Sequence, residues 1–316
     1  MVTDHLGRQF KTLRLSVSPE CNFACTYCVD VKDKNIHVDP HKTLKPEEFC
    51  ELVTSIHEVV NLESVRLTGG EPLLYKAVPQ LVRLLRELGI PKVKLTTNGS
   101  LLARQAKSLK DNGLDSINVS LDALDPDVFR RVTPRGHLDK VLTGIDKAIE
   151  VGLKVKINCI VMKGVNESQI LPLLRFAGDR GITVRFLELM KMGYLYHDFA
   201  SYLFSEEDIL NEITREYPFV SLERKESATA RYWETMDHTI FGIIANDSSP
   251  FCSDCNRLRL SHDGKIYGCL SVNQGFSLIE SDKSPLETER ILLKAMGQKQ
   301  QNHFVGSPLS MKAIGG

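Results

Sequence analysis

The chain has 316 residues, of which 42% are apolar and 25% charged, and its 40 lysines and arginines balance its 40 aspartates and glutamates. This composition is that of an ordinary globular protein and excludes a disordered one. A net charge of zero excludes a general attraction to nucleic acid or to membranes, so any site for an anion must be local.

No apolar run approaches the roughly 20 residues that a membrane span needs, and the N-terminal residues lack the apolar segment of a secretory signal. We therefore expect a cytoplasmic protein. Cysteines are poor candidates for disulfides in that compartment, where clustered thiols usually bind metal or react. Six of the cysteines form two triplets, which are Cys21, Cys25 and Cys28 near the start and Cys252, Cys255 and Cys269 near the end. Cys50 and Cys159 stand alone in apolar segments, and we expect both to be buried.

Six short runs rich in β-branched residues alternate with helical segments between residues 12 and 190, which is typical of parallel βα units. The runs are residues 12–18, 64–70, 92–98, 116–122, 154–162 and 183–189. The helical segment 45–60 begins with a proline and two glutamates, which suit the first turn of a helix.

Five of the six runs alternate apolar and polar residues, although strands covered on both faces usually read as continuously apolar. Arg14, Arg66 and Lys94, for example, fall on the polar side of their runs. If helices cover the apolar side, the polar side must line an interior that holds a ligand, because unpaired polar groups are costly in a dry core. This predicts an α/β fold, an open partial (β/α)6 TIM-type barrel that is wider than the closed eight-stranded kind.

The alternation stops after residue 190. We predict a barrel domain over residues 1–195 and a smaller C-terminal α+β region over residues 196–316 that covers the barrel mouth. In the second region, Asp263 and Gly264 have the composition of a hairpin turn, and residues 284–300 have that of a helix.

The first cysteine triplet follows the first predicted strand, at the carboxyl end of the sheet where barrel active sites are built. A four-iron cluster is ordinarily bound by four thiolates, so three thiolates leave one iron with an open position for a ligand. The alternative is a structural zinc ion with His37 or His41 as its fourth ligand.

The second triplet also supplies three thiolates, and its alternative interpretation is a zinc ribbon that lacks one ligand pair. Arg257 and Arg259 follow it at alternate strand positions, so their guanidinium groups share one face that suits phosphate or, alternatively, is merely solvated. After the second strand, Gly69 and Gly70 would let backbone approach a ligand closely, and Glu71 offers a carboxylate to an ammonium group. The two glycines are also compatible with a simple turn.

The C-x-x-x-C-x-x-C loop with Tyr27 before its last cysteine, followed by Gly-Gly-Glu-Pro at residues 69–72, resembles the radical S-adenosylmethionine (SAM) superfamily. The C-x-x-C-N-R-x-R pattern at residues 252–259 and the terminal Gly315 and Gly316 make the chain similar to the GTP 3',8-cyclases of molybdenum cofactor biosynthesis. This resemblance extends from about Asp4 to the last residue.

The resemblance implies two [4Fe-4S] clusters, one on each triplet, with S-adenosyl-L-methionine at the open iron of the first and the guanine end of GTP at the second. It implies a 5'-deoxyadenosyl radical that takes hydrogen from the ribose of GTP, after which the sugar closes onto guanine C8. It further implies a low-potential electron donor, a homodimer, and a downstream cyclic pyranopterin monophosphate synthase as partners.

The resemblance also implies roles for individual residues. Those expected to be catalytic are Cys21, Cys25, Cys28, Gly315 and Gly316. Those expected at SAM are Tyr27, Gly69, Gly70, Glu71, Ser120 and Met190. Of these, Gly69, Gly70 and Glu71 were already proposed above to contact a ligand. Those expected at GTP are Arg14, Arg66, Thr96, Lys156, Arg185, Arg257 and Arg259. In one departure from the family pattern, Ser64 stands where a lysine is often found, which predicts a missing phosphate contact for which Lys94 or Arg135 could compensate.

Two other functions are compatible with parts of this pattern. A radical SAM peptide maturase would also carry an auxiliary cluster, although its auxiliary region usually has more than three cysteines. A noncatalytic electron carrier or zinc-binding scaffold would need neither the Gly-Gly-Glu-Pro segment nor a cationic interior.

Overall fold

The computed structural model describes residues 2–29 and 43–308. His37, His41, Gly315 and Gly316 lie outside these ranges, so the predictions for them remain predictions. None of the helices described is both long and apolar enough to cross a lipid bilayer.

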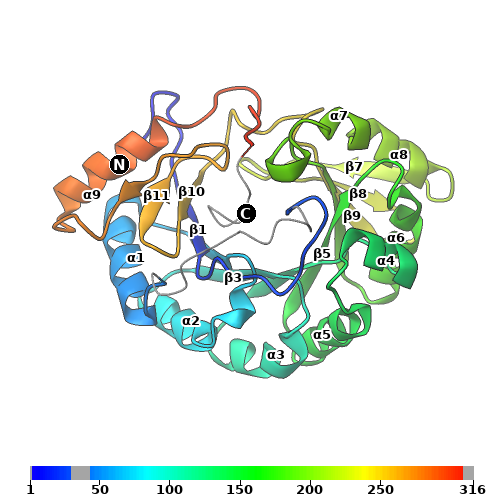
Figure 1. The fold of residues 1–316 in the computed structure, drawn as a ribbon, viewed down its shortest axis with the longest axis horizontal. Coiled ribbons are helices and arrows are strands. Elements are labelled where there is room, and N and C mark those ends of the chain that lie inside the picture. Colours follow the sequence, from blue (N-terminus) through cyan, green and yellow to red (C-terminus); the bar gives the residue numbers. More distant parts are fainter. Residues whose placement is uncertain (1, 30–42, 309–316) are drawn as a thin grey trace.

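Six parallel strands, neighbours in chain order, form the centre of the structure and confirm the predicted βα units. They are β1 (Thr12–Ser16), β2 (Ser64–Thr68), β3 (Lys92–Thr97), β4 (Ser116–Ser120), β5 (Lys154–Val161) and β6 (Thr183–Glu188). The sheet curls around a central space, and the helices between the strands cover its outer side (Figure 1).

The helices of the barrel follow the strands in the expected order. They are α1 (Pro46–Val60), α2 (Val78–Glu87), α3 (Leu102–Asp111), α4 (Pro126–Val132), α5 (Leu138–Glu150) and α6 (Ile170–Asp179), with short 3₁₀ turns η2 (Pro72–Leu74), η3 (Glu167–Gln169) and η4 (Gly193–Leu195). At the start of α1, the Glu48 carboxylate accepts a hydrogen bond from the Lys45 backbone N–H at 2.7 Å. This satisfies a backbone donor that a helix start would otherwise leave without a partner.

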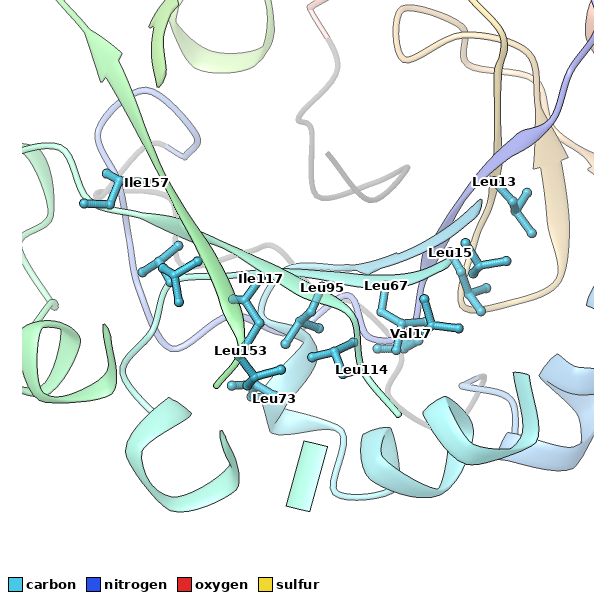
Figure 2. Close-up of a cluster of buried hydrophobic side chains, with 14 of the residues drawn as sticks. Leu13, Leu15, Val17, Leu67, Leu73, Leu95, Leu114, Ile117, Leu153 and Ile157 are labelled. Atoms are coloured by element: carbon cyan, nitrogen blue, oxygen red, sulfur yellow. The ribbon is translucent and has the colours of Figure 1, made fainter. Parts of the chain in front are cut away.

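The apolar residues of the strands lie under the outer helices. Leu15 on β1, Leu95 on β3 and Ile157 on β5 are fully buried there, and Figure 2 shows them pointing to the same side of the sheet. Cys159 is also fully buried as predicted, whereas Cys50 is only half-buried on α1. Because strand side chains alternate between faces, the polar residues between these apolar ones face the interior.

The C-terminal region extends the barrel sheet at both edges. On one side β10 (Arg257–Leu260) pairs parallel to β1 and leads to β11 (Lys265–Tyr267) and β12 (Phe276–Ser277). On the other side β9 (Ile240–Ile244) pairs parallel to β6 and leads to β8 (Arg231–Thr235) and β7 (Phe219–Leu222). The remaining helices are α7 (Phe199–Tyr202), α8 (Glu206–Thr214) and α9 (Pro285–Met296).

Within the described residues the sheet therefore has 12 strands, and its end strands β12 and β7 do not pair with each other. The barrel is open, as predicted. Residues 245–256 join β9 on one flank to β10 on the other, so this segment crosses the open side. Strands from both predicted domains share one sheet, and the boundary at residue 195 stays a prediction.

Candidate active site

The two cysteine triplets lie at opposite ends of the barrel interior. Cys21, Cys25 and Cys28 follow β1 and so lie beyond its carboxyl end. Cys252 and Cys255 precede β10, which runs parallel to β1, and Cys269 follows the antiparallel β11. The second triplet is consequently at the amino ends of the barrel strands, and the interior between the triplets is lined by the polar strand face.

The loop with the first triplet is a tight turn fastened to the end of α4. The Cys25 carbonyl accepts hydrogen bonds from the Cys28 and Val29 N–H groups at 2.9 and 3.1 Å, and the Thr26 N–H donates to the Val132 carbonyl at 2.9 Å. The Phe23 N–H donates to Cys21 Sγ at 3.4 Å. Contacts of this kind position a thiolate that binds metal.

Burial raises the pKa of Cys25 far above its ordinary value, and the nearby Asp122 and Cys28 raise it further. Cys25 and Cys28 are thus near enough for their charges to interact, and a thiolate there is stabilised only by a strong cation such as iron. None of the described cysteines is in a disulfide.

Gly69 and Gly70 let the end of β2 pack against the loop that precedes the first triplet. A Cβ on Gly69 would lie 2.4 Å from the Ser18 carbonyl oxygen, and one on Gly70 would lie 2.2 Å from that of Glu20. The Gly70 N–H donates to Ser18 O at 2.7 Å. The close approach predicted for these glycines is therefore, in the structure, to the loop that carries Cys21.

Glu71 is 1% exposed, and both of its carboxylate oxygens are bonded to the protein. One oxygen accepts from Thr97 Oγ1 at 2.6 Å and from the Leu73 N–H at 3.0 Å, and the other accepts from the Asn98 N–H at 2.7 Å. Burial raises the pKa of Glu71 to about 7, against the lowering effect of these bonds. These bonds tie the turn after β2 to the end of β3, and the ammonium contact that the sequence suggested for Glu71 stays a prediction.

Tyr27 is buried, and its hydroxyl donates to Asp122 Oδ2 at 2.9 Å, while Asp122 Oδ1 accepts from the Ile160 N–H at 2.8 Å. Burial raises the pKa of Asp122 to about 6. The sequence placed Asp122 only on the polar strand face. It could not indicate the hydrogen bond with Tyr27, because the two residues are 95 positions apart.

Ser120 ends β4 on the same polar face, opposite Asn158 of β5. Met190 follows β6 and packs against a small cluster of Met192, Tyr267 and Leu270 rather than against the apolar cluster that contains Tyr27. The structure thus brings Ser120 to the interior but separates the apolar surroundings of Tyr27 and Met190.

A row of cations crosses four neighbouring strands of the interior. Arg259, Arg14, Arg66 and Lys94 are directly paired in register on β10, β1, β2 and β3. The other residues predicted at GTP also occupy strand positions on this face, namely Thr96 on β3, Lys156 on β5, Arg185 on β6 and Arg257 on β10. The alternation of the sequence had indicated this shared face for β1 to β5.

Arg259 is buried, and Arg14, Arg66 and Lys94 are partly buried beside it. Burial is the largest cause that lowers the pKa of Arg14, and Arg259, Arg257 and Arg66 lower it further. The pKa of Arg66 falls to about 9 through burial and Arg185, and that of Lys94 falls to about 8 through burial and then Arg66. Like charges confined in this way favour an anionic ligand strongly.

Three cations of this row have no carboxylate partner in the described part of the chain. None of the ion pairs among the described residues includes Arg14, Arg66 or Lys94. Arg257 Nη2 and Arg185 Nε are buried without a hydrogen-bond partner in the described part of the chain. Buried donors left in this state cost stability, which a bound polyanion would recover.

Tyr232 of β8 is an interior residue that the sequence did not identify. Its hydroxyl lies 3.1 Å from Lys156 Nζ, which donates to it, and its ring centre lies 4.8 Å from the same nitrogen. The position of Tyr232 follows from the pairing of β8 with β9 and of β9 with β6. No local pattern in the sequence indicates that these strands are neighbours.

The second triplet lies among cations that suit thiolates. Lys299 Nζ donates to Cys255 Sγ at 3.0 Å, and Arg8 Nη1 donates to the Cys252 carbonyl at 2.6 Å. Burial raises the pKa of Cys255, but Arg257 and Lys299 more than offset it, and the pKa falls to about 6. Burial, Cys269 and Cys255 raise the pKa of Cys252 to about 11, which shows that the three sulfurs are close enough to interact.

Both donor sets consist of three thiolates, which is compatible with an iron-sulfur cluster. Among the described residues, no three His, Cys, Asp or Glu side chains are placed to bind one metal ion together. In a four-iron cluster each thiolate binds a different iron, so the sulfurs need not converge on one point. The residues that would hold the two clusters are those of the two triplets.

Comparisons with known proteins agree with this geometry. The family model described as Radical SAM superfamily matches residues 15–177, and the one described as Molybdenum Cofactor Synthesis C matches residues 182–305. A curated GTP 3',8-cyclase of Nautilia profundicola is 39% identical over 99% of this chain and 98% of its own length. Another, of Staphylococcus carnosus, is 38% identical over 93% of this chain and 88% of its own length.

Solved structures share the fold at low identity. The structure of Streptococcus suis SuiB bound to precursor peptide SuiA has a TM-score of 0.63 and 19% identity, and the match covers 87% of this chain but 63% of that one. Native anSMEcpe with bound AdoMet has a TM-score of 0.57 and 15% identity, with 86% of this chain and 81% of that chain covered. By its family models and its curated relatives, this chain belongs to the radical SAM superfamily and, within it, to the GTP 3',8-cyclase family.

Proposed function

We propose that this enzyme binds GTP across the barrel interior and converts it to (8S)-3',8-cyclo-7,8-dihydroguanosine 5'-triphosphate, an early step of molybdenum cofactor biosynthesis. The observation that carries the proposal is the row of four cations on neighbouring strands, Arg259, Arg14, Arg66 and Lys94. A nucleoside triphosphate has several negative charges in a chain of phosphates, which matches several cations on neighbouring strands.

The proposal assigns SAM and one [4Fe-4S] cluster to the carboxyl end of the barrel, on Cys21, Cys25 and Cys28. Together the cluster and SAM supply the one-electron chemistry that removes hydrogen from the substrate. Tyr27, Gly69, Gly70, Ser120 and Met190 surround SAM in this proposal. Glu71 holds the turn in place through the hydrogen bonds described above.

The second cluster, on Cys252, Cys255 and Cys269, is assigned to the amino end of the strands, where it faces the guanine. A substrate whose base lies toward one end and whose ribose lies toward the other fits an interior with a cysteine triplet at each end. A substrate held inside the barrel would be shielded from bulk water, which limits side reactions of a carbon radical.

Lys156 and Arg185 complete the anion site from the opposite wall of the interior. Tyr232 holds the Lys156 ammonium at 3.1 Å, and Arg185 Nη2 donates to Asn158 Oδ1 at 2.6 Å, which leaves other guanidinium donors for the substrate. Thr96 Oγ1 lies 3.4 Å from Arg66 Nη1 and positions that side chain. The proposal further includes a low-potential electron donor, a homodimer, a product passed to a cyclic pyranopterin monophosphate synthase, and a Gly315 and Gly316 tail that reaches the active site.

Anaerobic reconstitution with iron and sulfide tests the function. We expect about eight irons per chain, from two four-iron clusters, and, after reduction with dithionite, formation of 5'-deoxyadenosine and a cyclised nucleotide that requires both SAM and GTP. Cys25→Ala should abolish 5'-deoxyadenosine formation, whereas Arg257→Ala should keep the iron content and weaken GTP binding.

Three outcomes would contradict parts of the proposal. SAM cleavage that is indifferent to GTP would favour a peptide substrate, and bound zinc in place of iron would favour a scaffold. An Arg257→Ala protein with unchanged GTP affinity would remove Arg257 from the nucleotide site.

A further inference from the structure

Lys94 lies at one end of the cation row; the sequence named it with Arg135 as a cation that could compensate for Ser64, and the comparisons assign it no role. It is directly paired with Arg66 across β2 and β3, so it takes the next inward position after Arg259, Arg14 and Arg66. The neighbouring inward position on β2 is Ser64, which is buried and whose Oγ has no hydrogen-bond partner among the described residues. Next to Arg66, the interior therefore has a cation at Lys94 on β3. It has no cation at position 64, the preceding inward position on β2.

The charge on Lys94 has no carboxylate of its own. The charged groups that face it are Arg66 on β2, Lys92 on β3, Lys156 on β5 and Asp115 at the start of β4. Only Asp115 is acidic, and its Oδ2 already accepts from the Val93 N–H at 2.7 Å and pairs with Arg86 at 3.6 Å. Lys94 is half-buried, yet it forms no ion pair among the described residues, so its ammonium group is kept for a ligand.

The order of the row decides which part of the substrate Lys94 can reach. Arg259 is on the strand that follows Cys252 and Cys255, and Lys94 is three strands away. Three strand spacings of roughly 4.8 Å separate their backbones by up to about 14 Å along the sheet, so Lys94 is the cation of the row farthest from the strand that follows the second triplet. If the base lies near the second triplet, the phosphate chain runs along the row away from Arg259.

We propose that Lys94 binds the terminal phosphate of GTP and makes the site selective for the triphosphate over shorter nucleotides. This inference rests on the proposed function, because it takes the guanine end to lie at the second triplet. Arg135, the other cation that could replace a residue at position 64, is exposed in the segment between α4 and α5. The same role is therefore assigned to Lys94 and not to Arg135.

The test compares binding of GTP, GDP and GMP to the reconstituted protein and its variants by anaerobic calorimetry. Lys94→Met keeps the length of the side chain and removes its charge, so GTP affinity should fall about 10- to 100-fold, the usual value of one hydrogen bond between charged groups. GMP affinity should change by less than about 2-fold, since GMP lacks the phosphate that Lys94 binds. Lys94→Arg should recover most of the GTP affinity.

Matched controls separate this role from folding. Lys107→Met removes a lysine that is exposed on the outer helix α3, where it pairs with Asp111, and should alter no nucleotide affinity. Iron content and thermal stability of Lys94→Met should equal or exceed those of the unaltered protein, because an unpaired, partly buried charge is lost.

The outcomes distinguish this inference from the function on which it rests. If the unaltered protein binds GTP and Lys94→Met binds it equally well, or loses GTP and GMP affinity alike, the role of Lys94 is refuted and the function stands. If the unaltered protein binds inorganic tripolyphosphate in a Lys94-dependent way but not GTP, the function is refuted while the anion site on Lys94 survives. Binding of neither refutes both.

Discussion

The contact between Gly70 and the first cysteine loop allows one quantitative prediction. In Gly70→Ala the new Cβ would lie 2.2 Å from the Glu20 carbonyl oxygen and 2.6 Å from the Glu20 carbonyl carbon, whereas ordinary contact begins at 3.4 Å. The clash is with backbone, which cannot rotate away as a side chain would. The Pro19–Glu20 segment must therefore retreat by about 1 Å, and it carries Cys21 with it.

A displacement of this size is enough to disrupt cluster binding, because metal ligands must keep their distances to within about 0.2 Å. We also expect a loss of about 1–3 kcal/mol in folding stability, the usual cost of overpacking a well-packed site. The second triplet lies at the other end of the strands and should be unaffected. Reconstituted Gly70→Ala should thus bind about half the iron of the unaltered protein, by the loss of one cluster of two, and should not cleave SAM.

Iron analysis, electron paramagnetic resonance of the reduced protein and a 5'-deoxyadenosine assay measure these effects. Gly297→Ala is the matched control, because a Cβ at Gly297 would meet no atom closer than 3.4 Å and the residue already has helical backbone angles. It should retain both clusters and full activity. A Gly70→Ala protein with a full iron complement and an unchanged rate of SAM cleavage would refute the reasoning that Gly70 seats the cluster loop.

Three further predictions follow from buried charges and from the chain terminus. Burial raises the pKa of Asp122 to about 6 from 3.8, so its ionised form opposes folding. The cost is absent below pH 3.8, grows as the pH rises from 3.8 to about 6, and stays constant above that. Asp122→Asn should therefore be more stable to unfolding than the unaltered protein at pH 8, by up to about 3 kcal/mol. Thermal melts should show that this gain in stability vanishes near pH 4. A stability difference independent of pH would contradict this. In cluster-free protein, iodoacetamide should alkylate Cys255 near pH 7 faster than Cys252, because Arg257 and Lys299 hold the Cys255 pKa near 6 despite burial. Lys299→Met should move the midpoint of the pH profile of Cys255 alkylation upward. An unmoved midpoint would show that Lys299 does not act on this thiol. Removal of Gly315 and Gly316 should leave the iron content unchanged and reduce turnover, and an unchanged turnover would exclude the tail from the active site.

Several features of the fold and the site could be read from the sequence because they depend on short-range order. The alternation of Arg14 with Leu13 and Leu15 shows which strand face is apolar, and burial of that face under helices then leaves Arg14 inside. The spacing of Cys21, Cys25 and Cys28 places three thiols in one turn whatever the rest of the chain does. These local patterns were sufficient for the open barrel, the two triplets and the cationic interior.

Other features depend on which strands become neighbours, and only the tertiary structure decided them. Arg259 lies beside Arg14 because β10 joins the edge at β1, and Tyr232 reaches Lys156 because β8 and β9 join the edge at β6. Lys299 meets Cys255 across 44 positions of sequence. Likewise, only the structure shows that Glu71 accepts three hydrogen bonds from Leu73, Thr97 and Asn98.

The physical reason is that periodicity reports how a residue relates to its own strand or helix, whereas strand order and register arise from packing among segments far apart in the chain. The direction of β10 shows this most clearly, because its parallel pairing with β1 is what sets the second triplet at the end of the barrel opposite the first. Residue spacing determined that each triplet could bind a cluster. The fold determined that a row of cations would lie between them.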